Sequence, residues 1–277
     1  MSLNSVNTNK GAMIALQNLN STNKDLGTVQ NRVNTGLKIA TAKDNGAIWA
    51  IAQNQRAESA SLNSVISSLQ RGQSVADVAM SAGTAISDIL VQMKEKVLAA
   101  TEAGLSTASK QALSDEYQSL RDQIDTIANN ASFDGVNLIS STGVNNASIK
   151  AIANADATAT IDIDHIVLSK SNTKIAATLG SLTGTVGSAD VQEIEDAIQD
   201  VSSALSKLGT GAKALETHMT NVMKLQDTLD AGIGNLVDAD LAKESARLQA
   251  LQTKQQLGVQ ALSIANQSSS ILLGLFR

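Results

Sequence analysis

The stretch VQEIEDAIQDVSSALSKLGTGAKALETHMTNVMKLQDTLDAGIGNL, residues 191–236, decides the fold of this chain. Its apolar residues recur at alternating steps of three and four, which is the a/d spacing of a coiled-coil helix. The fourteen positions of this seam are Val191, Ile194, Ile198, Val201, Leu205, Leu208, Ala212, Leu215, Met219, Val222, Gln226, Leu229, Ile233 and Leu236. Only Gln226 among them is polar, so the sequence predicts one long helix that packs against another along its length.

A second seam in the first half of the chain has the same spacing, and its centre consists of small residues. Its positions are Leu62, Val65, Leu69, Gly72, Ala76, Ala79, Gly83, Ile86, Leu90, Met93, Val97 and Ala100. A glycine inside a helix costs about 1 kcal/mol relative to alanine. We therefore expect the small-residue seam, Gly72, Ala76, Ala79 and Gly83, to admit a neighbouring helix at very close range. The alternative is that both glycines are neutral.

The middle of the chain changes character. A third, shorter seam runs from Leu113 to Ala131, and Phe133-Asp-Gly135 is a turn signal. Residues 158–168 then alternate between polar and apolar side chains, which is typical of a strand. We expect a β-hairpin or small β patch that covers one end of the helices. The predicted fold is thus mainly α, a long antiparallel coiled-coil bundle with a small β-hairpin region in the middle.

Composition excludes several classes of function. The chain has no proline and no cysteine, a net charge of −5 and only four aromatic residues, which fits long aliphatic helices and offers no general attraction to nucleic acid. The uncharged stretch 255–276 carries too many amides and hydroxyls for a membrane span. Strand alternation places Asp162 and Asp164 on one side and His165 on the other, so a metal site is not expected. We predict no catalytic residue, metal or cofactor.

Both extremes of the chain are poor in charge yet periodic. The apolar side chains at the N-terminal end are Leu19, Leu26, Val29 and Val33, and those at the C-terminal end are Leu257, Ala261, Ile264, Ile271 and Leu275. Burying about ten such side chains at about 1.5–3 kcal/mol each offers a driving force on the order of 15–30 kcal/mol before ordering entropy is subtracted. Two paired terminal helices bury one face together, and their outer faces then need further copies. Contacts between different faces of identical subunits give a helical polymer by default.

At these positions the chain resembles bacterial flagellin, in a short form whose outer variable domains are reduced or absent. The N-terminal resemblance lies in Asn7-Thr-Asn9, Leu16, Leu19, Arg32-Val-Asn-Thr-Gly36 and Lys43-Asp44, and it continues through Ile51-Ala52 and Phe133-Asp-Gly135. The C-terminal resemblance lies in Ala265-Asn266-Gln267 and Leu272-Leu273-Gly-Leu275-Phe-Arg277. The chain departs from the family pattern at Val33-Asn-Thr35 and at Asn45–Trp49. We take Arg32, Gly36, Lys43, Asp44, Asn266 and Arg277 as the signature residues.

The resemblance implies an architecture and a role. Residues 1–40 and 237–277 would form the inner helical domain of the filament, residues 41–131 and 188–236 the central helical domain, and residues 132–187 a short surface region. The chain would polymerise with itself into the extracellular filament that serves swimming motility. Its implied partners are the flagellar type III export apparatus, a secretion chaperone, the filament cap and the hook–filament junction proteins, and export would need no cleaved signal peptide.

Two alternatives to this interpretation remain open. A hook–filament junction protein would have similar ends, and a non-flagellar coiled-coil scaffold would share the heptads. The scaffold should carry charged ends and form a small closed oligomer, whereas the flagellin should form fibres that depend on residues 1–35 and 241–277.

Overall fold

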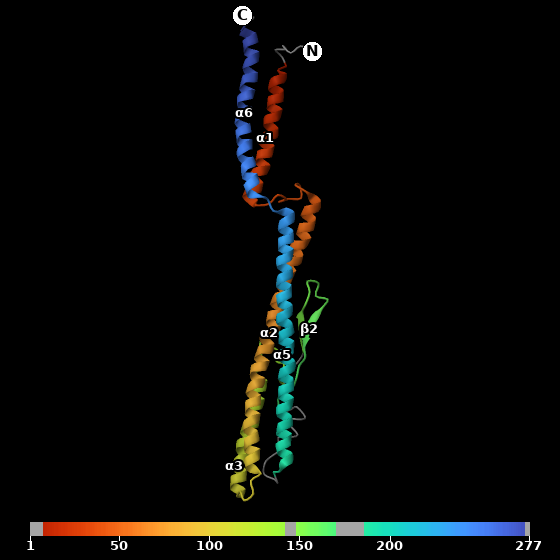
Figure 1. Ribbon diagram of the computed structural model, residues 1–277, viewed down its shortest axis with the longest axis vertical. Helices are drawn as coiled ribbons and strands as arrows, with labels where there is room; N and C mark the ends of the chain where they lie inside the picture. Colours follow the sequence, from red (N-terminus) through yellow and green to blue (C-terminus); the bar gives the residue numbers. More distant parts are fainter. Residues whose placement is uncertain (1–7, 142–147, 170–185, 275–277) are drawn as a thin grey trace. The chain divides into compact units, whose positions relative to one another are not determined.

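The computed structural model describes residues 8–141, 148–169 and 186–274, and its side chains are described as far as residue 267. The chain divides into two compact units (Figure 1). Unit 1 consists of residues 1–57 and 228–277, and unit 2 of residues 58–227. The domain boundaries drawn from the sequence, at residues 40/41 and 236/237, stay predictions.

The described part of unit 2 is built on a bundle of three helices, which run side by side in Figure 1. Its elements are α2 (Gly46–Ala100), α3 (Thr107–Asn130) and α5 (Ser188–Val237), of which α2 and α5 continue into unit 1. Lys94 of α2 contacts Glu195 near the start of α5 at 2.7 Å, whereas Asn63 contacts Gln226 near its end at 3.0 Å. The two helices are therefore antiparallel, and the predicted fold class is confirmed.

The seams predicted from the sequence are covered along both helices, and their positions between residues 58 and 227 lie in the core of this bundle. All twelve positions of the α2 seam are buried, and none of the fourteen positions on α5 is exposed. Gly209 and Gly211 lie within α5 and do not interrupt it. One helix among the described residues, α2, is long and apolar enough by length and composition to cross a membrane. The buried seam of α2 accounts for part of this apolar content.

A two-stranded antiparallel sheet packs on the bundle. It consists of β1 (Ile149–Ile152) and β2 (Thr160–Ile163), paired so that Ile149 faces Ile163 and Ile152 faces Thr160. The expected hairpin is present, but its expected position over one end of the helices is wrong. Ile152 N donates to Ser68 Oγ of α2 at 3.0 Å, and a ring nitrogen of His218 on α5 lies 2.7 Å from the carbonyl oxygen of Ala153.

Glycines explain why the hairpin lies beside the middle of both helices. A Cβ at Gly72 of α2 would lie 3.4 Å from the Cβ of Ala151, and one at Gly211 of α5 would lie 3.0 Å from Cγ1 of Ile163. Each glycine thus removes the side chain that would hold the sheet away from the helices. Helix α5 also approaches the small-residue seam closely, since a Cβ at Gly72 would lie 3.2 Å from Cδ1 of Leu215 and one at Gly83 would lie 2.8 Å from Cδ2 of Leu205.

One buried amide organises the connection after α3. Asn137 is 7% exposed, and its Nδ2 donates to the carbonyl oxygen of Ala128 at 2.7 Å, near the end of α3. Its Oδ1 accepts hydrogen bonds from the backbone N–H groups of Ile139 and Ser140, both at 2.9 Å. The single side chain therefore caps the helix and fixes the loop that carries the buried Leu138 and Ile139 into the core.

Unit 1 contains the two terminal helices, α1 (Lys10–Thr35) and α6 (Leu241–Gly274), with residues 46–57 of α2 and 228–237 of α5. The connections beside α1 and α6 pair with one another, since Lys38 N donates to the carbonyl oxygen of Val237 at 2.7 Å and Ala239 N to that of Gly36 at 2.8 Å. A small apolar cluster of Ile39, Ala52, Ile233 and Val237 lies next to this pairing, and Trp49 packs against it.

Candidate polymerisation surface

The terminal helices pair in antiparallel fashion through contacts at both ends and in the middle. Asn9 Nδ2 donates to the carbonyl oxygen of Ala265 at 2.6 Å, Gln255 Nε2 donates to Asn23 Oδ1 at 2.7 Å, and Arg32 forms an ion pair with Glu244 at 3.2 Å. Asn9 also accepts from Ala12 N and so caps α1. The carboxylate of Asp240 accepts from Lys243 N and caps α6. Figure 1 shows α1 and α6 alongside each other.

The predicted residues of α1 face α6. Leu26 and Val29 are buried in a cluster with Leu251, and Val33 and Leu248 pack against it. Leu19 lies against Gly258, where an added Cβ would be 3.3 Å from Cδ1 of Leu19. The four residues Leu19, Leu26, Val29 and Val33 thus hold the two helices together within one chain.

The predicted residues of α6 point the other way. Leu257 is 59% exposed and Ile264 68% exposed, and Ala261 between them is also exposed. Ile271 lies in α6, but its side chain and the whole of Leu275 fall outside the described residues. Sequence reasoning missed the matching exposed side chains on the other helix, Met13 and Ile14, which are 64% and 59% exposed. Both of the paired helices therefore expose apolar side chains that the chain itself leaves uncovered.

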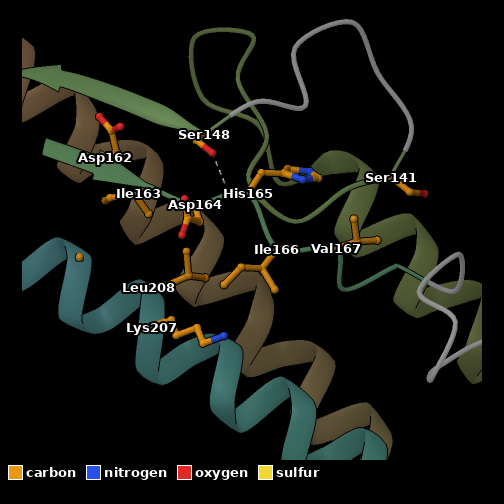
Figure 2. A pocket seen from close by; sticks show the side chains of 11 residues that line it. Ser141, Ser148, Asp162, Ile163, Asp164, His165, Ile166, Val167, Lys207 and Leu208 are labelled. Carbon is orange, nitrogen blue, oxygen red and sulfur yellow. Dashed lines mark hydrogen bonds between the residues drawn. The ribbon is translucent and has the colours of Figure 1, made fainter. Parts of the chain in front are cut away.

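The alternative site around His165 lacks the geometry of a metal centre. Its ring contacts the carbonyl oxygen of Ser140 at 2.7 Å, and in Figure 2 the ring points away from the exposed carboxylates of Asp162 and Asp164. His165, Asp162 and Asp164 line one pocket, and Lys207 of α5 also lines it. Within the described ranges, no three His, Cys, Asp or Glu residues come together as metal ligands. His165 and His218 each bond a backbone carbonyl oxygen and thereby brace the segments next to the sheet.

Comparison with known proteins identifies the family. Residues 6–144 match the bacterial flagellin N-terminal helical region, and residues 191–276 match the bacterial flagellin C-terminal helical region. The chain is a bacterial flagellin. It is 55% identical over 277 residues to flagellin FljK of Caulobacter vibrioides, with 100% of both chains covered. It is also 36% identical over 283 residues to a flagellin of Brucella melitensis, covering 99% of each chain.

A solved structure shares the fold. A protein assigned as a flagellar hook-associated protein of Vibrio parahaemolyticus aligns with a TM-score of 0.58 and 15% identity, over 70% of this flagellin and 100% of that chain. The full-length flagellin relatives establish the role, because flagellins are structural proteins. This flagellin is a structural subunit of the extracellular flagellar filament and assembles with copies of itself.

The N-terminal signature residues of this flagellin cluster where α1 ends and the chain turns. Gly36 has a φ of 71°, a left-handed conformation that favours glycine, and its N–H closes α1 on the carbonyl oxygen of Arg32. Asp44 accepts from the backbone and hydroxyl of Thr41 and from Ala40 N, and these bonds hold the pKa of its carboxyl below the usual value. Lys43 beside it is exposed.

The C-terminal signature residues are placed differently. Asn266 is exposed on α6, whereas Arg277 falls outside the described residues. Glu244 was not singled out from the sequence, although it is the partner of Arg32. Its position was detectable, because it is the acidic residue in the first turn of α6 and lies on a row spaced by three and four residues.

Proposed function

We propose that the paired α1 and α6 helices are the part through which this flagellin polymerises, by way of their outward apolar side chains. The observation that carries the proposal is the exposure of Leu257 and Ile264 on α6 together with Met13 and Ile14 on α1. Each side chain covered by another subunit contributes about 1.5–3 kcal/mol. Ala261 lies between Leu257 and Ile264 on the same row of α6. In the sequence, Ile271 and Leu275 continue its spacing.

The residues facing inward support the same surface. Leu19, Leu26, Val29 and Val33 keep the two helices paired, so that both outward sets are presented together. The signature residues Arg32, Gly36 and Asp44 shape the end of α1 and the turn that follows it. The small-residue seam of α2 belongs to unit 2, so it packs the bundle there and is not part of the proposed surface.

The test replaces the outward-facing aliphatic side chains of α6 by serine. Leu257→Ser and Ile264→Ser should abolish or strongly slow seeded growth of fibres, as followed by light scattering and negative-stain microscopy, while helical content stays that of the parent. Leu225→Ser is a matched control, because Leu225 is 48% exposed on a helix of unit 2. Fibres from Leu257→Ser/Ile264→Ser at the parent rate would refute the proposal.

We also assign this flagellin the route and partners of its family, and no catalytic activity. It leaves through the type III export apparatus without losing an N-terminal signal, a chaperone covers α6 beforehand, and it meets the cap and junction proteins at the filament. Support comes from the uncovered apolar surface of α6, which needs protection before assembly. Intact mass of protein taken from filaments should equal that of the full chain, and a shortened N-terminus would contradict uncleaved export.

A second candidate role is that of a junction protein, favoured by the fold shared with the hook-associated protein from Vibrio parahaemolyticus. The two roles differ in location. Immunogold labelling along the whole filament supports a filament subunit, whereas labelling confined to the hook end supports a junction protein.

A further inference from the structure

Helix α6 carries two rows of residues with the same spacing, and only one of them faces α1. The inner row is buried or half-buried and consists of Glu244, Leu248, Leu251, Gln255, Gly258, Leu262 and Ala265. The outer row starts one residue earlier, is exposed throughout and consists of Lys243, Arg247, Ala250, Lys254, Leu257, Ala261 and Ile264. One residue corresponds to about 100° around a helix, so a rotation of that size would turn the outer row toward α1 and the inner row away from it.

Toward the end of α6 the apolar side chains do not decide between these two rows. The inner row has Leu262 and Ala265 there, and the outer row has Leu257, Ala261 and Ile264, so either could pack against α1. The charges differ sharply, however. The inner row holds a single charged residue, the acidic Glu244, whereas the outer row holds three cations, Lys243, Arg247 and Lys254.

Arg32 is the charged side chain of α1 that contacts the inner row of α6. Its side chain is 24% exposed, and its Nη1 lies 3.2 Å from Oε1 of Glu244, whose side chain is 10% exposed. Arg32 Nε and Glu244 Oε2 are buried without a hydrogen-bond partner among the described residues. A largely buried ion pair with unsatisfied atoms adds little net stability, and the best-attested role of such pairs is to fix register. A rotated α6 would bring Lys243 and Arg247 toward Arg32 instead.

We propose that Arg32 selects the face of α6 that packs on α1, by attracting Glu244 and repelling the cations of the outer row. The choice determines which side chains remain uncovered. With the inner row turned toward α1, Leu257 and Ile264 stay outside, whereas the rotated pairing would bury them and expose Leu248 and Leu251. This inference deepens the proposed polymerisation surface and rests on it.

Disulfide trapping within one chain can test the selection, because the chain has no cysteine. A Cβ at Gly258 would lie 4.0 Å from the Cβ of Leu19, which is within the range that a disulfide spans. Leu19→Cys/Gly258→Cys therefore reports the observed face, and Leu19→Cys/Leu257→Cys reports the rotated one. Both pairs are placed in the full-length chain and oxidised before and after seeded assembly, and the intrachain disulfides are quantified by non-reducing electrophoresis and peptide mapping.

The pairs are compared in three backgrounds: the parent, Arg32→Glu, and Arg32→Glu/Glu244→Arg. The parent should form mostly the 19–258 disulfide. Arg32→Glu repels Glu244 and attracts Lys243 and Arg247, so the ratio of 19–258 to 19–257 disulfide should fall about tenfold, as expected when an attractive charge pair becomes a repulsive one. The double substitution should restore the parent ratio.

A ratio unchanged by Arg32→Glu would overturn the inference. Loss of both disulfides in that background would overturn it as well, because the ion pair would then hold the helices together without choosing a face. The proposed polymerisation surface is judged separately by fibre growth. If the disulfide ratios behave as expected but Leu257→Ser/Ile264→Ser forms normal fibres, the proposed polymerisation surface is refuted and the selection by Arg32 is not.

Discussion

Gly211 of α5 lies directly under Ile163 of β2, so that a Cβ at this glycine would meet three side-chain carbons of Ile163 at 3.0, 3.3 and 3.5 Å. Ile163 is 3% exposed and belongs to the buried core. The backbone of α5 can approach the sheet this closely only because residue 211 has no side chain.

Gly211→Ala should therefore destabilise unit 2 by about 1–2 kcal/mol, because overpacking outweighs the gain in helix propensity. Gly209→Ala is the matched control two residues away, since its Cβ would meet nothing closer than the sulfur of Met80 at 3.8 Å. That substitution should stabilise by about 0.5–1 kcal/mol. Urea unfolding of the monomer measures both, and equal shifts of the same sign would contradict the close contact.

Asn137→Ala should cost about 2–4 kcal/mol, because it leaves the N–H groups of Ile139 and Ser140 unpaired inside unit 2. Asn154 is the comparison, because its Oδ1 also accepts two backbone N–H groups but in the exposed hairpin loop. Water can replace the lost bonds there, so Asn154→Ala should cost under about 1 kcal/mol. Thermal unfolding followed by circular dichroism distinguishes the two, and similar losses would show that burial of Asn137 is unimportant.

Tyr117, the only tyrosine of the chain, should make unit 2 sensitive to alkali. It is 1% exposed, and burial raises the pKa of its phenol well above the ordinary value of 10.0. The neutral phenol is therefore favoured in the folded chain. Its contribution to stability is fully present below pH 10 and declines above it, as the unfolded chain releases the proton and the folded chain does not.

Tyrosinate absorbance and helical circular dichroism should consequently change together above pH 10, in one cooperative step. Tyr117→Phe should remove the absorbance change and move the loss of helix to higher pH. Ionisation of Tyr117 with the helical signal intact would contradict its burial.

Asp44 should make the stability of the turn between α1 and α2 depend on pH in the acid range. Hydrogen bonds from Thr41 lower the pKa of its carboxyl below 3.8, so its contribution is present above that value and is lost as the pH falls through the lower, folded pKa. Trp49, three residues into α2 and packed on the small apolar cluster, reports on this region by its fluorescence. Asp44→Ala should shift the Trp49 emission to longer wavelength at neutral pH.

The same shift should appear in the parent only under acid conditions. Asp44→Asn keeps an oxygen acceptor but cannot titrate, and it should lack this acid step. Superimposable acid profiles for the parent and Asp44→Asn would exclude Asp44 as its source.

The seams were predictable because a buried helix face repeats every three and four residues whatever its partner. The positions from Leu62 to Ala100 and from Val191 to Leu236 needed only this rule, and both are covered in the structure. The position of the hairpin was not predictable in the same way. It depends on Gly72 and Gly211 meeting Ala151 and Ile163, and such contacts join residues that have no periodic relationship.

The sequence predicted that the terminal helices are apolar, but not which of their side chains face inward and which face outward. A deficit of charge identified both ends, yet Leu26 and Val29 face inward while Leu257 and Ile264 face outward. Periodicity alone cannot separate two rows of α6 that have identical spacing. The reason that the acidic row faces α1 becomes visible only in the contact of Glu244 with Arg32, between residues 212 positions apart.

The bond from Asn9 to the carbonyl oxygen of Ala265 spans 256 positions. A polypeptide that stops short of α6 can still form most contacts of unit 2, but its α1 has no helix to lie against. On the proposed polymerisation surface, completion of synthesis is therefore a physical condition for joining the fibre, and an interrupted translation product is excluded from it.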